Sequence, residues 1–386
     1  MSDAEQIVYL NGAFLPMGEA KVPVLDRGFI YGDGVYEVIP VYHRAPFRMP
    51  HHLKRLQYSL DGIRLANPMD DDAWDALVRE LVARQPFDDQ SVYLQVTRGV
   101  AKRDHAFPKG ARPTVFMMSN PLPLPSREQV ERGVAAVTAD DNRWHRCDLK
   151  TTSLLGNVLM RQRAADLDAV ETVMFRDGWL TEASASNVLI VRGGTIVAPP
   201  KDHQILPGIT YDATIEFARE AGMPMEIRPV RREEALSADE MWLSSSTKEV
   251  LAITTLDGKP FGSGVPGPVF RRMYAAFQAH TRGIRGSDRR RRRVAVLVEH
   301  EAAAFAARAV LHVADEHDVV AGAVARMVRA LDPRDAPVDQ RGARPAEPKR
   351  DAFEAVGVRP REPASEVDLV RSQHVDAVAL GPLERR

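Results

Sequence analysis

The chain has 386 residues, of which 44% are hydrophobic and 27% charged, and its formal net charge is −1. This length allows two domains with a sizeable core, and the near-neutral balance gives no indication of a nucleic-acid or membrane partner. The single cysteine, Cys147, excludes an intramolecular disulfide and is typical of a reducing compartment. Without a signal-peptide pattern or a run of roughly 18 apolar residues, the chain is expected to be cytoplasmic, with no membrane partner.

The first segment, residues 1–119, alternates strand patterns with amphipathic helix patterns. The Asn-Gly turn in "IVYLNGAFLP" predicts a β-hairpin. Further elements are expected along the segment: strands at 35–42, 91–99 and 113–119, and helices at 49–65 and 72–85. This order predicts a small N-terminal domain of mixed helices and strands, α+β in class, with a largely antiparallel sheet.

Three prolines at alternate positions mark "NPLPLPSREQ", residues 120–129, as an interdomain linker. A larger C-terminal domain is predicted at 130–282. Its expected elements are strands near 133–138, 171–176, 186–191 and 241–244, and helices near 154–167 and 209–221. No internal repeat, zinc-type spacing, P-loop or GxGxxG pattern is present.

Composition changes at the end of this second domain. Residues 1–282 hold 25 arginines and 8 lysines, whereas residues 283–386 hold 18 arginines and 1 lysine and neither tyrosine nor tryptophan. The run Arg289–Arg293 allows a nucleic-acid-binding tail, but acidic residues are interleaved after it. We therefore expect 283–386 to be a poorly ordered extension without a nucleic-acid partner.

One lysine, Lys150, lies in "RCDLKTTSLLGNVL" between an expected strand and a helix from Leu154, for which Ser153 is the expected N-cap. An amine at such a junction can be partly desolvated, which lowers its pKa and makes it nucleophilic. Most lysines are solvated surface residues, however, so position alone favours a structural interpretation of Lys150.

Three other local patterns allow a ligand-binding interpretation beside a plain structural one. Glu182 in "TEASASN" could face the ring nitrogen of a ligand or be an ordinary turn glutamate. Gly208 opens a helix and Ser244–Thr247 follow a strand, which makes either a phosphate cradle or a simple cap and turn. Arg103 and His105 could bind a carboxylate or belong to a solvated loop.

A lysine nucleophile, an acid for a pyridinium nitrogen and a phosphate cradle are together what pyridoxal 5′-phosphate (PLP) requires. Seven motifs occur in order within residues 7–282: "DRGFIYGDGVYEV", "HLKRL", "QVTRGVAKRDHAFP", "RCDLKTTSLLGNVL", "TEASASNV", "ILPGITYD" and "WLSSSTKE". In order and spacing they resemble the D-amino-acid aminotransferases of the class IV aminotransferase family. The resemblance implies the two-domain α+β architecture of PLP fold type IV, with PLP as cofactor and an atypical C-terminal extension.

The resemblance also implies a role for each matching residue. Lys150 resembles the lysine that bonds covalently to PLP, Glu182 the carboxylate that pairs with the pyridine nitrogen, and Tyr36 the tyrosine beside the reacting carbon. The residues similar to those that hold the phosphate and the ring are Arg55, Leu206, Ile209, Thr210 and Ser246. Arg103 and His105 match the pair that, with Tyr36, binds the substrate α-carboxylate. No metal is expected.

The implied reaction is transamination between a D-amino acid, such as D-alanine, and a 2-oxo acid, such as 2-oxoglutarate, giving pyruvate and D-glutamate. A homodimer with the cofactor site near the subunit interface is implied as well. Alternatives of the same fold are a branched-chain L-amino-acid aminotransferase, an R-selective amine transaminase and an aminodeoxychorismate lyase. The motif "VYEV" and the Arg-x-His pair disfavour the branched-chain enzyme, and the same pair disfavours the amine transaminase. A PLP-binding regulatory protein with a nucleic-acid-binding tail is disfavoured by the presence of Lys150, Glu182 and Tyr36 together.

Overall fold

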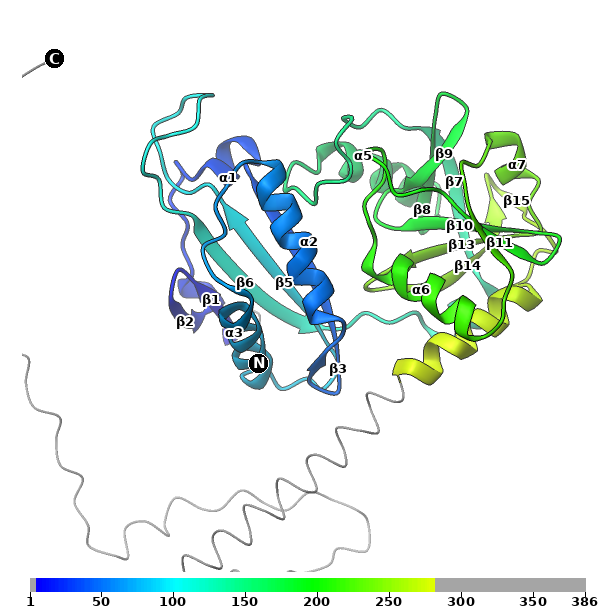
Figure 1. The fold of residues 1–386 in the computed structure, drawn as a ribbon, viewed down its shortest axis with the longest axis horizontal. Coiled ribbons are helices and arrows are strands. Elements are labelled where there is room, and N and C mark those ends of the chain that lie inside the picture. Colours follow the sequence, from blue (N-terminus) through cyan, green and yellow to red (C-terminus); the bar gives the residue numbers. More distant parts are fainter. Residues whose placement is uncertain (1–4, 282–386) are drawn as a thin grey trace, which may run out of the picture. The chain divides into compact units, whose positions relative to one another are not determined.

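A computed structural model of the chain describes residues 5–281 (Figure 1). The predicted extension at 283–386 lies outside the described residues. The described strands form two sheets, one from strands up to Pro121 and one from strands that begin at Val134. The predicted α+β class is confirmed by these two sheets and the helices between their strands. None of the helices within residues 5–281 is both long and apolar enough to cross a membrane.

The first sheet has six strands in the order β2-β1-β6-β5-β3-β4. They are β1 (Ile7–Leu10), β2 (Ala13–Pro16), β3 (Gly34–Tyr42), β4 (Ala45–Pro46), β5 (Gln90–Thr97) and β6 (Thr114–Pro121). Every neighbouring pair is antiparallel, as the sequence predicts. Buried residues alternate with partly buried ones along β5, because successive side chains of a strand point to opposite faces.

Two helices, α2 (Met49–Gly62) and α3 (Asp71–Ala83), cover this sheet (Figure 1). The predicted apolar stripe of α2 is buried at Leu53, Leu56 and Leu60, and these side chains belong to one apolar core with residues of β3 and β5. Burial of this stripe fixes the rotation of α2 about its axis. The positions of Arg55 and Ser59, which are also buried on α2, are thereby fixed. Two short elements precede β3, a 3₁₀ helix η2 (Met17–Glu19) and α1 (Arg27–Tyr31).

The second sheet has nine strands, in the order β12-β11-β10-β13-β14-β7-β8-β9 with β15 beside β14. They are β7 (Val134–Asp140), β8 (Glu171–Arg176), β9 (Trp179–Ala183), β10 (Asn187–Arg192), β11 (Thr195–Ala198), β12 (Met225–Ile227), β13 (Glu240–Ser245), β14 (Glu249–Leu256) and β15 (Lys259–Pro260). The sheet is mixed, since β14, β7 and β8 are parallel neighbours and β11 is parallel to β12.

The helices of this part are α4 (Arg127–Arg132), α5 (Leu155–Asp166), α6 (Ile209–Glu220), α7 (Arg232–Leu236) and helical residues 268–281. The strands expected near 133–138, 171–176, 186–191 and 241–244 and the helices expected near 154–167 and 209–221 are confirmed. The additional elements are β9, β11, β12, β14, β15, α4, α7 and the final helix. The stretch predicted as a linker is irregular only in its middle, because β6 extends to Pro121 and α4 begins at Arg127. The domain boundaries themselves stay a prediction.

The predicted N-cap of α5 is wrong. Leu154 occupies the N-cap position and no side chain caps this helix. Ser153 instead donates its hydroxyl to the carbonyl of Gly32 at 3.0 Å, next to the first sheet. This tertiary hydrogen bond takes the hydroxyl that a local cap would need.

Candidate active site

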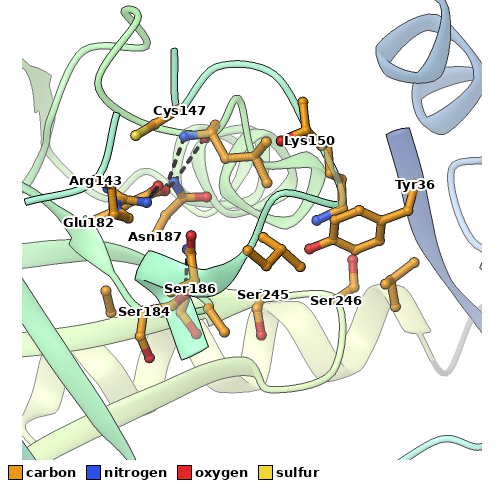
Figure 2. A pocket seen from close by; sticks show the side chains of 18 of the residues that line it. Tyr36, Arg143, Cys147, Lys150, Glu182, Ser184, Ser186, Asn187, Ser245 and Ser246 are labelled. Carbon is orange, nitrogen blue, oxygen red and sulfur yellow. Dashed lines mark hydrogen bonds and ion pairs between the residues drawn. The ribbon is translucent and has the colours of Figure 1, made fainter. Parts of the chain in front are cut away.

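A cavity of about 390 Å³ is lined by residues of both sheets and of the segments that connect their strands. This volume is typical of a site for a small molecule. The cavity brings together the residues predicted to bind the cofactor or to react: Tyr36, Arg55, Lys150, Glu182, Leu206, Ile209, Thr210 and Ser246. Figure 2 shows the amine of Lys150 beside the ring of Tyr36, with Glu182 and Arg143 on the other side of the view.

Lys150 reaches this cavity from an irregular segment between β7 and α5. The predicted strand in front of it is wrong, since residues 141–150 form none. Hydrogen bonds from the first sheet and its helix hold it instead. The Lys150 backbone N–H donates to Ser59 Oγ of α2 at 3.1 Å, and its carbonyl accepts from the Tyr36 N–H of β3 at 2.9 Å. Lys150 Nζ then lies 4.3 Å from the centroid of the Tyr36 ring.

Glu182 lies near the end of β9 and is buried. Its Oε1 accepts from Arg143 Nη1 at 2.6 Å. Its Oε2 accepts from the side-chain amide of Asn187 at 3.2 Å and from the backbone N–H of Leu206 at 3.1 Å. Burial raises the pKa of Glu182, while the charge and hydrogen bond of Arg143 oppose that rise. The carboxylate is thus held at the cavity wall by three donors.

Arg55 is buried on α2 and is held by a second carboxylate, Glu37 of β3. Arg55 Nε and Nη2 donate to the two Glu37 oxygens at 2.8 and 2.7 Å, and Nη1 donates to the carbonyl of Pro207 at 3.0 Å. Burial would raise the pKa of Glu37, but the charge and hydrogen bonds of Arg55, with a hydrogen bond from His52, lower it. Three of the five guanidinium protons are used in this way, so two remain for a ligand in the cavity.

The N-terminal end of α6 opens into the same cavity. Gly208 is its N-cap, no side chain caps it, and Ile209 and Thr210 form its first turn. A Cβ on Gly208 would lie 2.0 Å from Asn187 Oδ1, so any larger residue here would have to displace the Asn187 side chain. The Ser244 hydroxyl, which also lines the cavity, is buried without a hydrogen-bond partner among the described residues. Uncapped backbone N–H groups, hydroxyls and a nearby arginine make a site for an anion such as a phosphate.

These groups fit PLP by chemistry. An amine suits its carbonyl carbon, a buried carboxylate its ring nitrogen, and the uncapped helix end with Arg55 and the unpartnered Ser244 hydroxyl its phosphate. Leu206 supplies an apolar side chain to the same cavity. Within residues 5–281, no group of three His, Cys, Asp or Glu residues could hold a metal ion.

Arg103 and His105 do not line this cavity, unlike the other predicted residues. Both are exposed on the connection between β5 and β6. The Arg103 guanidinium carbon and the His105 ring lie 5.5 and 5.4 Å from the ring centre of Tyr31. Arg27 supports their loop by donating to the carbonyl of Asp104 at 2.5 Å. The predicted pair is therefore together in space, but apart from Lys150 and Glu182.

Sequence reasoning missed the residues that hold the predicted ones in place. Arg143, Ser59, Asn187 and Glu37 bind Glu182, Lys150 or Arg55 directly. Nothing in the local pattern singles out Arg143 or Ser59, because each lies far from its partner in the chain. A partial signal exists for Glu37, which lies in "GVYEV" next to Tyr36, and for Asn187, which lies in "TEASASNV" with Glu182.

Comparison with known proteins identifies the family. The model of the amino-transferase class IV family matches residues 34–256, which is more than half of the chain. The chain therefore belongs to the class IV aminotransferases and is an aminotransferase, which confirms the family and the enzyme class that the motifs predict. Enzymes of this class are PLP enzymes.

Individual relatives agree with this assignment. The chain is 38% identical over 271 residues to the D-alanine aminotransferase of Bacillus licheniformis, which covers 70% of this chain and 95% of the relative. It is 35% identical over 274 residues to the D-alanine aminotransferase of Staphylococcus aureus (strain N315), which covers 71% of this chain and 97% of the relative.

Similar solved structures include the branched-chain amino acid aminotransferase of Escherichia coli, with a TM-score of 0.68, 26% identity, and coverage of 71% of this chain and 94% of that one. Another is the T.th. branched-chain amino acid aminotransferase with pyridoxamine 5′-phosphate, with a TM-score of 0.67, 25% identity, and coverage of 72% and 95%. These likenesses confirm the predicted fold.

Proposed function

We propose that this chain catalyses PLP-dependent transamination between a D-amino acid, such as D-alanine, and a 2-oxo acid, such as 2-oxoglutarate, giving pyruvate and D-glutamate. The observation that carries the proposal is the presence of the Lys150 amine and the buried Glu182 carboxylate in one cavity. The D-amino-acid substrate is supported by the two relatives named D-alanine aminotransferase.

Each predicted residue has a role in this proposal. Lys150 would bond covalently to PLP, and its free amine would take up and deliver the proton of the substrate Cα. Tyr36 would keep the amine at the reacting carbon, since its ring lies beside Nζ. Glu182 would pair with the ring nitrogen. Bound PLP supplies an electron-withdrawing ring that stabilises negative charge at the substrate Cα.

The phosphate and the ring would be held on the same cavity walls. Arg55, Ile209, Thr210 and Ser246 would bind the phosphate, and Leu206 would pack on the ring. Arg55 is suited to this role because Glu37 and Pro207 fix its guanidinium while leaving protons free. A fixed donor binds an anion at a smaller entropic cost than a mobile one.

We further propose a homodimer. Helix α5 exposes an apolar stripe whose members Leu155, Val158 and Leu159 are 73%, 57% and 58% exposed. Val158 also lines the cavity, so a second copy covering α5 would close the site. Arg103 and His105, which lie outside the cavity of their own chain, would then bind the substrate carboxylate at the cavity of the second copy. The single cysteine supports the expectation of a cytoplasmic enzyme.

A substrate panel tests the proposed reaction. The PLP-loaded full chain is assayed with D-alanine, L-alanine, L-leucine and a simple chiral amine, each with 2-oxoglutarate as acceptor. Turnover of D-alanine well above the others is expected. Preference for L-leucine would instead favour a branched-chain enzyme, as the similar structures are, and preference for the amine would favour an amine transaminase.

A further inference from the structure

Four buried charges form a row that ends at the cavity, and Figure 2 shows the two members at that end, Arg143 and Glu182. Arg176 Nη2 lies 3.0 Å from Asp141 Oδ1, and Arg143 Nη2 lies 2.9 Å from Asp141 Oδ2. Arg143 Nη1 then bonds Glu182 Oε1 at 2.6 Å. The signs alternate along the row, and each inner charge has opposite charges on both sides. Of the four, only Arg143 and Glu182 line the cavity.

We infer that Arg143 is a positioning residue that keeps Glu182 ionised and aimed into the cavity. This inference rests on the proposed function, because Glu182 needs its charge there as the partner of a ring nitrogen. Three of the four acceptor positions of the Glu182 carboxylate are used by Arg143, Asn187 and Leu206. The fourth lies on Oε1, beside the Arg143 bond, and is available to the N–H of a protonated ring.

Arg143 is the group that can keep Glu182 charged. Burial of the Glu182 carboxyl favours its neutral form, and the pKa of Glu182 is raised on balance even with Arg143 present. Asp141 adds a further, smaller rise. The thiol of Cys147 also faces this group, but burial raises its pKa to about 11, so it is neutral near pH 7. Asn187 and Leu206 contribute uncharged donors only.

The charge of Arg143 is itself balanced by Asp141, which binds the guanidinium through both oxygens. The Glu182 carboxylate at the cavity wall therefore shares its countercharge, Arg143, with a second anion, Asp141. Without Asp141, the arginine would oppose a positive ring nitrogen more strongly. Without Arg143, Glu182 would take up a proton and could no longer serve as a counterion.

The experiment uses full-length chain loaded with PLP labelled with ¹⁵N in the ring, because the ¹⁵N chemical shift reports ring protonation directly. Arg143→Gln removes the charge and Arg143→Lys keeps it at similar size. Arg176→Gln is the matched control, since Arg176 binds the same Asp141 without contacting Glu182. We expect a protonated ring at pH 7 in the wild type, R143K and R176Q, and a neutral ring in R143Q, with kcat lowered by roughly 100-fold or more.

A protonated ring in R143Q, as in the wild type, would overturn the inference and leave the proposed function standing. A neutral ring in R143K would also overturn it, because the charge would then not be the cause. If R143Q does not fold, Arg143→Met is measured in the same way and with the same expectation. A wild-type chain that binds no PLP would instead overturn the proposed function, and the inference with it.

Discussion

The carbonyl of Lys150 accepts a hydrogen bond from the backbone N–H of Tyr36 at 2.9 Å, although the two residues belong to different parts of the chain. The neighbouring residues Val35 and Thr151 form an isolated β-bridge that continues this contact. The same contact brings Lys150 Nζ to 4.3 Å from the Tyr36 ring. The predicted nucleophile is thus positioned by the first sheet, while the predicted ring-nitrogen partner, Glu182, belongs to the second.

Replacement of the lysine tests its covalent role. Lys150→Ala is expected to abolish transamination and the visible absorbance of lysine-bound PLP. The fold is expected to persist, because the bonds to Ser59 and Tyr36 use backbone groups that alanine keeps. Lys201→Ala, which removes a surface lysine paired with Asp212, should change neither property. Turnover and absorbance that both survive in Lys150→Ala would contradict the assignment.

Hybrid dimers test whether Arg103 acts at the cavity of the second copy. Arg103→Ala and Lys150→Ala are each expected to be inactive with D-alanine. In an equal mixture of the two after subunit exchange, half of the dimers are hybrids with one intact site. Activity should then return to about a quarter of the wild-type value.

No recovery in exchanged dimers would show that Arg103 does not serve the second copy. Dimer exchange itself is checked with differently tagged chains. A monomeric protein at assay concentration, measured by light scattering, would contradict the homodimer.

The loop that carries Arg103 and His105 begins at Gly99, which has φ of +87°. A Cβ there would lie 1.8 Å from the carbonyl oxygen of Arg112, so Gly99→Ala must displace the loop. We expect unchanged PLP binding and a kcat/KM for D-alanine lowered by roughly 100-fold, as for other misplaced binding groups. Gly110→Ala is the control.

Gly110 lies in the same loop with φ of +72°, but a Cβ there has no atom within 4 Å. Gly110→Ala therefore introduces the same kind of backbone strain as Gly99→Ala but no collision of the new Cβ with a neighbouring atom. Equal losses in the two variants would attribute the effect to strain, and an unaffected Gly99→Ala enzyme would mean that the loop takes no part in substrate binding.

Glu37 is expected to matter for both stability and phosphate binding. Glu37→Gln leaves the buried guanidinium of Arg55 without its countercharge, which typically costs about 3–5 kcal/mol. A lower free energy of unfolding and weaker PLP binding should follow, measured by denaturant titration and by absorbance. Glu128→Gln, which breaks an exposed pair with Arg132, should cost less than about 0.5 kcal/mol. Unchanged PLP affinity in Glu37→Gln would show that Arg55 needs no fixed orientation.

The sequence alone determined the local elements and the chemistry of the site. Sequence patterns predicted five of the six strands of the first sheet, its helix α2 and the main strands of the second sheet, because burial on one face imposes a period of 2 or 3.6 residues. The order of the motifs was sufficient to identify the family. Lys150, Glu182 and the phosphate-cradle pattern at Gly208 and Ser244–Thr247 were together enough to suggest PLP.

Only the tertiary structure decided how these groups are held. The pairing of Arg143 with Glu182 and of Ser59 with Lys150 joins residues far apart in the chain, and such contacts leave no periodic trace in the sequence. The same holds for Ser153, whose hydroxyl is taken by Gly32 instead of capping α5. Arg103 and His105 lie outside the cavity for a related reason, because the path of their loop depends on packing around Arg27 and Tyr31 and not on local pattern.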